Sequence, residues 1–332
     1  MGRLIAIVVL TLGLLPGTCV RSPPAPFVGT QALTMQRIAV PRMRVGEMTL
    51  EGAWQLDSGH SDFNGFSALL ALPDGRFLAA TDGGTAAFFP QPGTPGQVRI
   101  APFGGVRPRN KMLADIESLA LDPRTGDVWA GYEHRHAIAR FDPQLRQIRR
   151  VLPEQMRRWP ANSGAEAMVR LADGRFVVLA EGGSFVRDSG GLLFAADPAG
   201  GGKAASFRYG HPQGYRPVDM AQLPDGRVLI LLRRVRLVPP GFEALIEVAD
   251  PAAIRPGKVW RGRAVARLQR PVPLDNYEGL AIRPQADGSV AVWLVSDDNN
   301  STFQRTVLLH LRWMPDKQKG APAKPARPFL IR

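Results

Sequence analysis

Cysteine is almost absent from this chain, which has one in 332 residues. A single cysteine excludes an internal disulfide framework and any zinc site built from cysteines of this chain. Several short catalytic and nucleotide-binding motifs are also missing, because the sequence contains no GxSxG, HExxH, Walker loop or dinucleotide fingerprint. The longest apolar run has twelve residues. As a helix this run is too short to cross the ~30 Å hydrocarbon layer of a bilayer.

Glycine, proline and basic residues are abundant instead. The 35 glycines and 30 prolines disfavour an all-helical protein and predict many tight turns. Lysine and arginine number 42 against 29 acidic residues, which gives a formal charge of +13. Hydrophobic residues make up 45 % of the chain, an ordinary content for a globular protein.

The N-terminus has the pattern of an export signal. A basic start, Met1–Arg3, precedes the apolar run at residues 4–15, which predicts a signal peptide over residues 1–21 and an exported, periplasmic or secreted protein. The lone cysteine, Cys19, stands where a lipoprotein signal would carry its acylated residue, so plain cleavage and lipidation both stay open. Residues 22–47 are expected to be an extended linker and residues 316–332 a basic tail.

One unit recurs five times in residues 48–315, the predicted folded domain. It consists of an apolar strand, a turn with Asp-Gly or a similar pair, and a second apolar strand, at residues 66–82, 116–133, 165–181, 218–234 and 277–298. Asp-Gly between alternating apolar runs predicts a hairpin. Equivalent positions Ser67, Glu117, Glu166, Asp219 and Glu278 are spaced by 50, 49, 53 and 59 residues, and a period near 50 built from short strands is typical of a β-propeller blade.

Further apolar segments give each unit two more strands. The fifth unit lacks its outer strand, and residues 50–57 can supply it and so close the ring. The predicted fold is therefore an all-β propeller with five four-stranded blades and an N-terminal strand that completes the last blade. A six-bladed ring stays open as the alternative.

Acidic residues gather at one rim of the predicted ring. Four of the five first strands begin with an acidic residue, and four of the five second strands end with one, although the chain is basic. Converging carboxylates bind hard cations or share protons as acid and base. The alternative is that individual carboxylates cap turns or pair with arginines. The predicted metal ligands, with calcium as the expected ion, are Asp82, Glu117, Glu166, Glu181, Glu278, Asp297 and Asp298.

Three other residues are candidates for contacts with a substrate. Ser67 begins the first inner strand and could act as a nucleophile or bind substrate. His134 follows the acidic end of a second strand and could face the rim. Arg305 follows the oxygen-rich segment 296–300 and could hold an anion through two hydrogen bonds, or pair with nearby carboxylates.

Most other arginines fall on the predicted outer strands, for example at residues 146–158, 233–236 and 255–270. Charged residues there protect a sheet edge, and they also allow association with an anionic membrane surface, as would a lipidated Cys19. No aromatic stacking platform accompanies the arginines, so a nucleic-acid partner is not expected. The expected partner is a small anionic or ester substrate, and the protein is expected to be a monomer.

The order of these phrases resembles the phytase-like domain family of exported bacterial proteins, often described by an esterase-like activity of phytase. The residues that carry the resemblance are 65–69 with PDGRFLAATDGG, 115–119, 164–168, and Asn276–Leu280 followed by Ser-Asp-Asp-Asn and Gln304–Thr306. The resemblance spans about residues 48–315. It implies a β-propeller and a hydrolase of phosphate or other ester bonds.

Two functions follow from these observations. In the first, Glu117, Glu166 and Glu278, together with a cation, activate water while Arg305 orients the anion. In the second, the same rim belongs to a non-catalytic periplasmic or envelope propeller that binds a ligand or partner.

Overall fold

A computed structural model describes residues 29–105, 114–160, 163–182, 187–299, 301 and 304–315 of the chain. The predicted signal peptide with Cys19, the first residues of the predicted linker and the basic tail lie outside the described residues. No helix in the described part of the chain is long and apolar enough to cross a membrane.

Three Asp-Gly-Arg turns show why the repeated phrases form hairpins. Gly75, Gly174 and Gly226 have φ angles of 91°, 91° and 90°, which glycine adopts without the steric cost of a Cβ atom. In each turn the aspartate side chain accepts a hydrogen bond of 3.0 Å from the backbone N–H of the arginine two residues later. The same local chemistry therefore closes the first hairpin of three different units.

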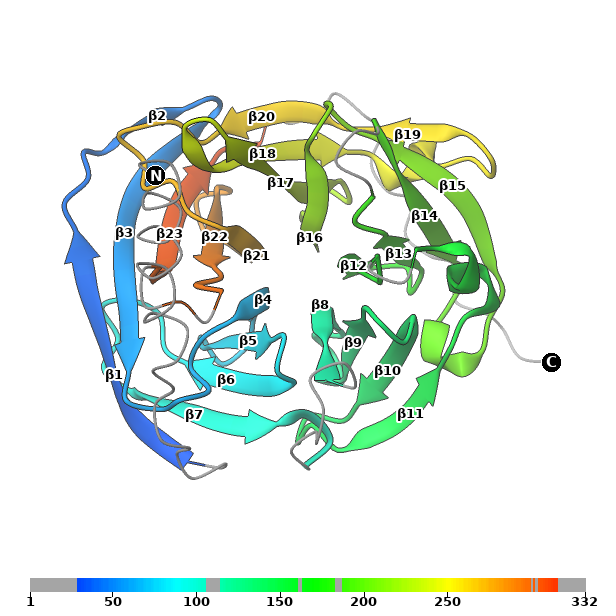
Figure 1. The fold of residues 1–332 in the computed structure, drawn as a ribbon, viewed down its shortest axis with the longest axis horizontal. Helices are drawn as coiled ribbons and strands as arrows, with labels where there is room; N and C mark the ends of the chain where they lie inside the picture. Colours follow the sequence, from blue (N-terminus) through cyan, green and yellow to red (C-terminus); the bar gives the residue numbers. More distant parts are fainter. Residues whose placement is uncertain are drawn as a thin grey trace, which may run out of the picture.

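The described strands form five antiparallel sets, each with an inner strand near the molecular axis (Figure 1). The first set is β4 (Phe66–Ala71), β5 (Phe77–Thr81), β6 (Thr85–Phe89) and β7 (Gln97–Pro102). The second is β8 (Ile116–Leu121), β9 (Val128–Tyr132), β10 (Ala137–Phe141) and β11 (Gln147–Val151). The third is β12 (Ala167–Arg170), β13 (Phe176–Leu179), β14 (Asp188–Phe194) and β15 (Ala204–Gly210), with β19 (Val259–Arg261) parallel to β15.

The last two sets complete a ring. The fourth is β16 (Arg216–Gln222), β17 (Val228–Leu237), β18 (Pro240–Ala249) and β20 (Arg263–Arg267). The fifth is β21 (Tyr277–Pro284), β22 (Val290–Ser296), β23 (Thr306–Trp313) and β3 (Met48–Ser58). The inner strands β4, β8, β12, β16 and β21 each contact the next one, and β21 contacts β4. This closed arrangement confirms the predicted all-β propeller.

The N-terminal part of the described chain joins two sets. β3 pairs antiparallel with β23, as predicted for a strand that completes the last blade. Residues 22–47 were predicted to be an extended linker, but their described part contains β1 (Gly29–Ile38) and β2 (Met43–Val45). β1 pairs with β3 on one side and β7 on the other. Its side chains alternate between exposed and partly buried, and Leu33 and Met35 pack against the core, so the segment is held by a half-buried face.

The hydrophobic core is divided among the interfaces between neighbouring sets. For example, Leu78 and Phe88 of the first set pack with Leu119 and Phe141 of the second. Four further clusters fill the other interfaces. Short four-residue turns on one side and this packing fix the relative positions of the inner strands, and with them the residues at the mouth of the central channel.

Candidate functional site

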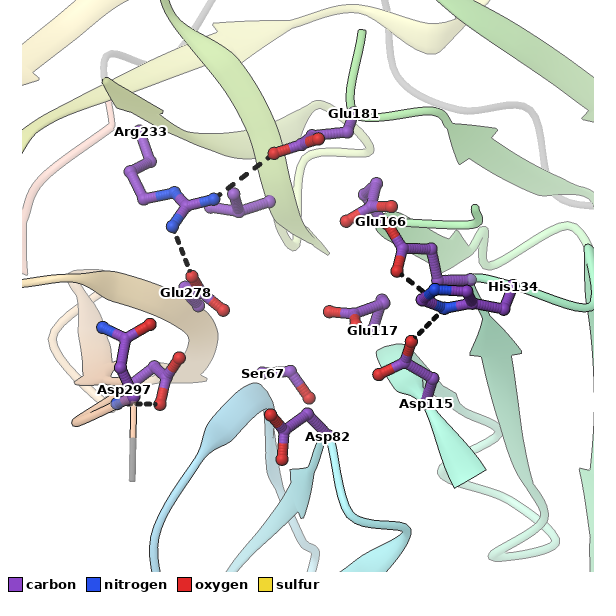
Figure 2. A pocket seen from close by; sticks show the side chains of 13 residues that line it. Ser67, Asp82, Asp115, Glu117, His134, Glu166, Glu181, Arg233, Glu278 and Asp297 are labelled. Atoms are coloured by element: carbon purple, nitrogen blue, oxygen red, sulfur yellow. Dashed lines mark hydrogen bonds and ion pairs between the residues drawn. The ribbon is translucent and has the colours of Figure 1, made fainter. Parts of the chain in front are cut away.

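An acidic cavity of about 490 Å3 lies at one end of the ring, where second strands end and inner strands begin. Figure 2 shows that its side chains come from all five sets and point toward a common space. Eight of them are carboxylic acids, while Arg233 is the arginine among them. The lining residues are Ser67, Asp82, Asp115, Glu117, Glu133, His134, Glu166, Glu181, Val218, Arg233, Glu278, Asp297 and Asn299.

A local irregularity turns four of these side chains into the cavity. The register of the inner strand shifts between Phe66 and Ala68, Ile116 and Ser118, Pro217 and Asp219, and Tyr277 and Gly279. The residues skipped in the pairing are Ser67, Glu117, Val218 and Glu278, and all four line the cavity. A β-bulge re-aims a side chain in this way. Glu166 directly precedes β12 and occupies the remaining position.

The fourth unit therefore differs from the sequence alignment by one residue. Val218, not Asp219, lies at the cavity, while the Asp219 side chain is 1 % exposed. Its carboxylate accepts hydrogen bonds from the backbone N–H groups of Leu280 (2.6 Å), Met220 (2.8 Å) and Leu69 (3.4 Å). Asp219 is thus a structural link between three inner strands.

Glu117 and Glu166 form the most strongly perturbed part of the cavity. Burial raises the pKa of both groups well above the ordinary value for glutamate, and neighbouring carboxylates raise it further. For Glu117 these neighbours include Glu166 and Glu278. The Gly164 N–H donates to Glu166 Oε1 at 2.9 Å and opposes the shift. Without a bound cation, both effects favour the protonated form of these groups relative to an exposed glutamate.

The opposite wall contains an ion-pair network. Arg233 Nη1 lies 2.6 Å from Glu278 Oε1 and donates to Asn276 Oδ1 at 2.8 Å. Its Nη2 lies 3.4 Å from Glu181 Oε1, which also pairs with Arg216. Burial raises the Glu278 pKa, while Arg233 and the Asn276 amide oppose that shift. This side of the cavity is therefore closer to charge balance than the side around Glu117.

Asp115, Glu133 and His134 form a compact cluster beside Glu117. One ligand atom from each of the three lies within 4.8 Å of the others. His134 Nδ1 is hydrogen-bonded to Asp115 Oδ2 and lies 3.0 Å from Glu133 Oε2. Burial, and then the hydrogen bond and charge of Asp115, raise the pKa of Glu133 to about 7. Two carboxylates and an imidazole at this spacing fit a divalent cation.

Asp297 and Asp82 complete the rim. Burial raises the pKa of Asp297 to about 8, with contributions from Glu278 and Asp82. Asp297 Oδ1 also accepts a 2.7 Å hydrogen bond from the Asn299 N–H. The raised pKa values on both sides of the cavity have a common cause, since many buried carboxyl groups share one space with little positive charge.

Two predicted site residues lie outside this lining. Asp298 accepts hydrogen bonds from the Gly65 N–H at 3.1 Å and the Thr306 hydroxyl at 3.2 Å, which links β23 to the residue before β4. The side chain of Arg305 is 46 % exposed, and its Nε lies 4.0 Å from Asp275 Oδ2. The structure therefore does not bring Arg305 to the other candidates.

Ser67 lines the cavity, but its hydroxyl is engaged with the backbone. It donates to the Ile116 carbonyl and lies 3.4 Å from the Ala80 carbonyl. A carbonyl oxygen cannot take a proton from serine as a histidine does in a catalytic triad. The geometry favours a structural link between two inner strands over a nucleophile.

The remaining predicted residues, Asp82, Glu117, Glu166, Glu181, Glu278, Asp297 and His134, do come together at the cavity. The predicted metal ligands, catalytic residues and substrate contacts did not include Asp115, Glu133, Arg233 or Asn299. A signal existed for Glu133 and Arg233, which stand at second-strand ends. For Asp115, the signal is its place next to the predicted inner strand that begins with Ile116.

The comparison with solved structures gives matches at low sequence identity, of which the endo-arabinase below agrees with the fold. Endo-arabinase from Bacteroides thetaiotaomicron has a TM-score of 0.50 and 8 % identity, over 76 % of this chain and 95 % of that one. The PQQ-bound aldose sugar dehydrogenase from Streptomyces coelicolor has a TM-score of 0.44 and 15 % identity, over 87 % and 100 %. Kuenenia stuttgartiensis hydrazine synthase has a TM-score of 0.40 and 15 % identity over 72 % of this chain, which spans 58 % of the hydrazine synthase chain. At such identities the likeness concerns the fold alone.

The family comparison is more specific. A search of curated proteins found no match. The model of the phytase-like family, described as "Esterase-like activity of phytase", matches residues 61–300. This range contains every residue that lines the acidic cavity. Because the match covers well over half of the 332 residues, the chain belongs to the phytase-like family.

Proposed function

We propose that this protein is a hydrolase of phosphate or other ester bonds that works with a divalent cation in the acidic cavity. The observation that carries the proposal is the convergence of eight carboxylic acids on one cavity with one lining arginine. The family description supports an esterase-like reaction. An anionic substrate would be repelled by these carboxylates alone, so a cation is needed to bring a phosphate ester into the cavity.

We assign the roles of the cavity residues from their protonation and their place in the cavity. Glu117, whose pKa is raised well above its ordinary value, holds a proton that it can donate to a leaving oxygen. Glu133, which lies in the cluster with Asp115 and His134, would act as a cation ligand and leave proton donation to Glu117. Glu166 and Glu278 enclose the same space. Arg233 keeps Glu278 in place through their 2.6 Å contact.

The cation would be held by Asp115, Glu133 and His134, with Glu117 and Glu166 beside them. When bound, it would polarise the ester oxygen and lower the pKa of a water molecule. The oxygen-rich lining suits calcium, which we retain as the proposed ion. His134 Nδ1 offers a nitrogen ligand as well, which suits zinc, and the metal series in the assay below distinguishes the two ions.

The decisive experiment combines substrate and metal. The purified full-length protein is treated with EDTA and assayed with p-nitrophenyl phosphate and p-nitrophenyl acetate, before and after addition of Ca²⁺, Mn²⁺ or Zn²⁺. Metal-dependent turnover that Glu117→Gln reduces by about 100-fold or more supports the proposal. Glu154→Gln, at an exposed position outside the cavity, is the matched control and should keep full activity.

A non-catalytic binding propeller is the second candidate. It is favoured by the carboxylates that already have partners, namely Glu278 with Arg233 and Glu181 with Arg216. Side chains held in ion pairs can bind a ligand without transferring a proton. This function predicts metal or ligand binding to the cavity with no turnover of any ester, even at high protein concentration. Equal ester hydrolysis by the wild type and Glu117→Gln would contradict the proposed mechanism.

We also propose that the protein is exported and acts as a monomer. The support is the N-terminal signal pattern and, in the described residues, a ring that closes within one chain. The intact mass of protein purified from an exported fraction distinguishes cleavage from acylation at Cys19. Light scattering of the same sample gives its oligomeric state.

A further inference from the structure

The second hairpin of the fourth set is unusually long. β17 and β18 each have ten residues, whereas β5, β9 and β13 have five, five and four. Arg233 lines the acidic cavity, so the residues after it continue beyond the rim. Pairing extends to Leu237 and Pro240. We call residues 234–242 the β17–β18 arm. Leu237 is four residues after Arg233, and at about 3.3 Å per strand residue it lies about 13 Å beyond Arg233 on the cavity side.

The end of the β17–β18 arm is apolar and fully in solvent. Leu237 is 81 % exposed, Val238 87 % and Val235 56 %. Pro239 and Pro240 beside them are also exposed. The segment 234–242, Arg-Val-Arg-Leu-Val-Pro-Pro-Gly-Phe, contains no acidic residue. Large apolar side chains gathered at a projecting tip are unusual on a protein surface and mark an interaction site.

The base of the arm is positively charged. Arg234 Nη2 lies 2.6 Å from Glu243 Oε2, Arg267 Nη1 lies 3.7 Å from the same oxygen, and Arg236 Nη1 lies 3.9 Å from Oε1. Three arginines thus share one carboxylate. The side chains of Arg236 and Arg267 are 41 % and 43 % exposed. A surplus of positive charge therefore surrounds the root of the apolar tip.

We propose that the β17–β18 arm inserts its tip into a bilayer of anionic phospholipids, with the arginines on the headgroup phosphates. A projecting apolar tip above a basic collar matches the layered chemistry of that surface, apolar inside and anionic at the headgroups. The chain as a whole is also attracted, since its formal charge is +13. The acidic cavity opposes docking only weakly, because three strand residues at about 3.3 Å each place Arg233 at its rim about 10 Å from phosphates bound by Arg236, beyond the ~8 Å Debye length at physiological salt.

A fluorescent label at the tip tests insertion directly. Cys19→Ser in the full chain removes the single cysteine and with it any acylation, and Leu237→Cys then provides a unique site for the environment-sensitive dye NBD. Vesicles of phosphatidylglycerol or phosphatidylcholine are added in EDTA, so that no cation bridges lipid phosphates to the cavity. Ile148→Cys, on β11 and 54 % exposed, carries the same dye as the matched control.

We expect the emission of the label at position 237 to rise roughly threefold and to shift to the blue with phosphatidylglycerol vesicles, as the dye leaves water for the interface. The label at position 148 should not respond, and Arg236→Gln or added salt should weaken the response at 237. Unchanged emission at 237, equal responses at 237 and 148, or equal responses to both lipids would each overturn the proposal. The readout does not depend on hydrolysis, so it stands or fails separately from the proposed activity.

Discussion

Arg233 Nη1 lies 2.6 Å from a carboxylate oxygen of Glu278 inside the acidic cavity. Their side chains are 17 % and 13 % exposed, so water screens this pair only weakly. Burial lowers the pKa of Arg233, but Glu278, Glu181 and Glu166 outweigh that effect and keep the guanidinium charged. Arg233 is therefore the positive group that permits several carboxylates to stay together here.

Removing this charge should destabilise the protein. We expect Arg233→Met to lower the free energy of unfolding at neutral pH by about 3 kcal/mol, because Glu278 and Glu181 lose their buried partner. Arg233→Lys keeps the charge and should cost less. Urea denaturation in EDTA measures both. The loss should shrink near pH 4, because burial raises the pKa of Glu278 and its protonation removes the charge that Arg233 compensates. A loss independent of pH would indicate packing as the cause instead.

The raised pKa values predict a pH dependence with a definite sign. Glu133 and Asp297 have pKa values of about 7 and about 8 in the folded protein, above the ordinary values of about 4.3 and 3.9 that apply after unfolding. Their contribution to stability is complete at low pH and is lost as pH rises through the folded pKa values. In EDTA, the urea concentration at the denaturation midpoint should therefore decrease as the pH is raised from about 5 to about 8.

Calcium should reverse this trend, because it binds the ionised carboxylates and stabilises only the folded state. The same titration in millimolar Ca²⁺ checks the point. A midpoint that falls with pH equally in Ca²⁺ and in EDTA would show that the cavity does not bind calcium.

His134 distinguishes calcium from a transition metal. Its Nδ1 lies 3.0 Å from Glu133 Oε2 and would be the nitrogen ligand of the cluster with Asp115 and Glu133. We expect His134→Gln to weaken zinc binding by at least about tenfold while calcium binding changes little, because calcium prefers oxygen ligands. Calorimetric titrations of EDTA-treated protein measure both affinities. His136, half-buried and outside the cavity lining, provides the matched control as His136→Gln.

The sequence was most informative where chemistry is local. The Asp-Gly-Arg turns identify the hairpins because the glycine conformation and the aspartate hydrogen bond both lie within three residues. The acidic rim followed from the repeat, since equivalent positions of a propeller face the same channel. Prolines around the β1 segment predict a linker. The structure differs because β1 pairs with β3 and β7, and these partners are remote in the sequence.

Side-chain direction was harder to predict. Ser67, Glu166 and Val218 each stand seven positions before the turn aspartate of their hairpin, at Asp74, Asp173 and Asp225. Counting back from the turn would therefore have placed Val218 at the cavity, but the acidic side chain of Asp219 was more conspicuous. The bulges that aim these residues leave no clear pattern in the sequence. The direction of Arg305 was also not predictable. It was expected to face a substrate anion, but its guanidinium lies toward Asp275.

Gly164 provides a test of how closely the second and third sets approach at the site. A Cβ atom at this position would lie 2.2 Å from the Glu133 Cα atom and 2.8 Å from the Tyr132 carbonyl oxygen. Gly164→Ala should therefore displace Glu133, weaken cation binding and destabilise the fold by about 2 kcal/mol or more. Metal titration and urea denaturation measure the two effects.

Gly174→Ala is the matched comparison for Gly164→Ala. Gly174 has φ +91°, but a Cβ atom there would meet no atom within 4 Å. The substitution should cost about 1–2 kcal/mol through backbone strain alone and leave cation affinity unchanged. If both variants bind the cation as tightly as the wild type, close backbone packing at Gly164 does not position Glu133.

Asp219 should be essential for stability although it lies outside the cavity. Its buried carboxylate receives N–H groups from Leu280 and Leu69 on the two other inner strands that meet there. Asp219→Ala would leave these buried donors without an acceptor, at a cost of about 1–3 kcal/mol each, so we expect a loss of about 3 kcal/mol or more in urea denaturation. Asp219→Asn keeps one acceptor oxygen and should lose less. Because burial raises the pKa of Asp219 well above its ordinary value despite these donors, the neutral asparagine should become relatively less harmful as pH rises. An Asp219→Ala protein as stable as the wild type would show that packing of the five cores alone holds the inner strands in register.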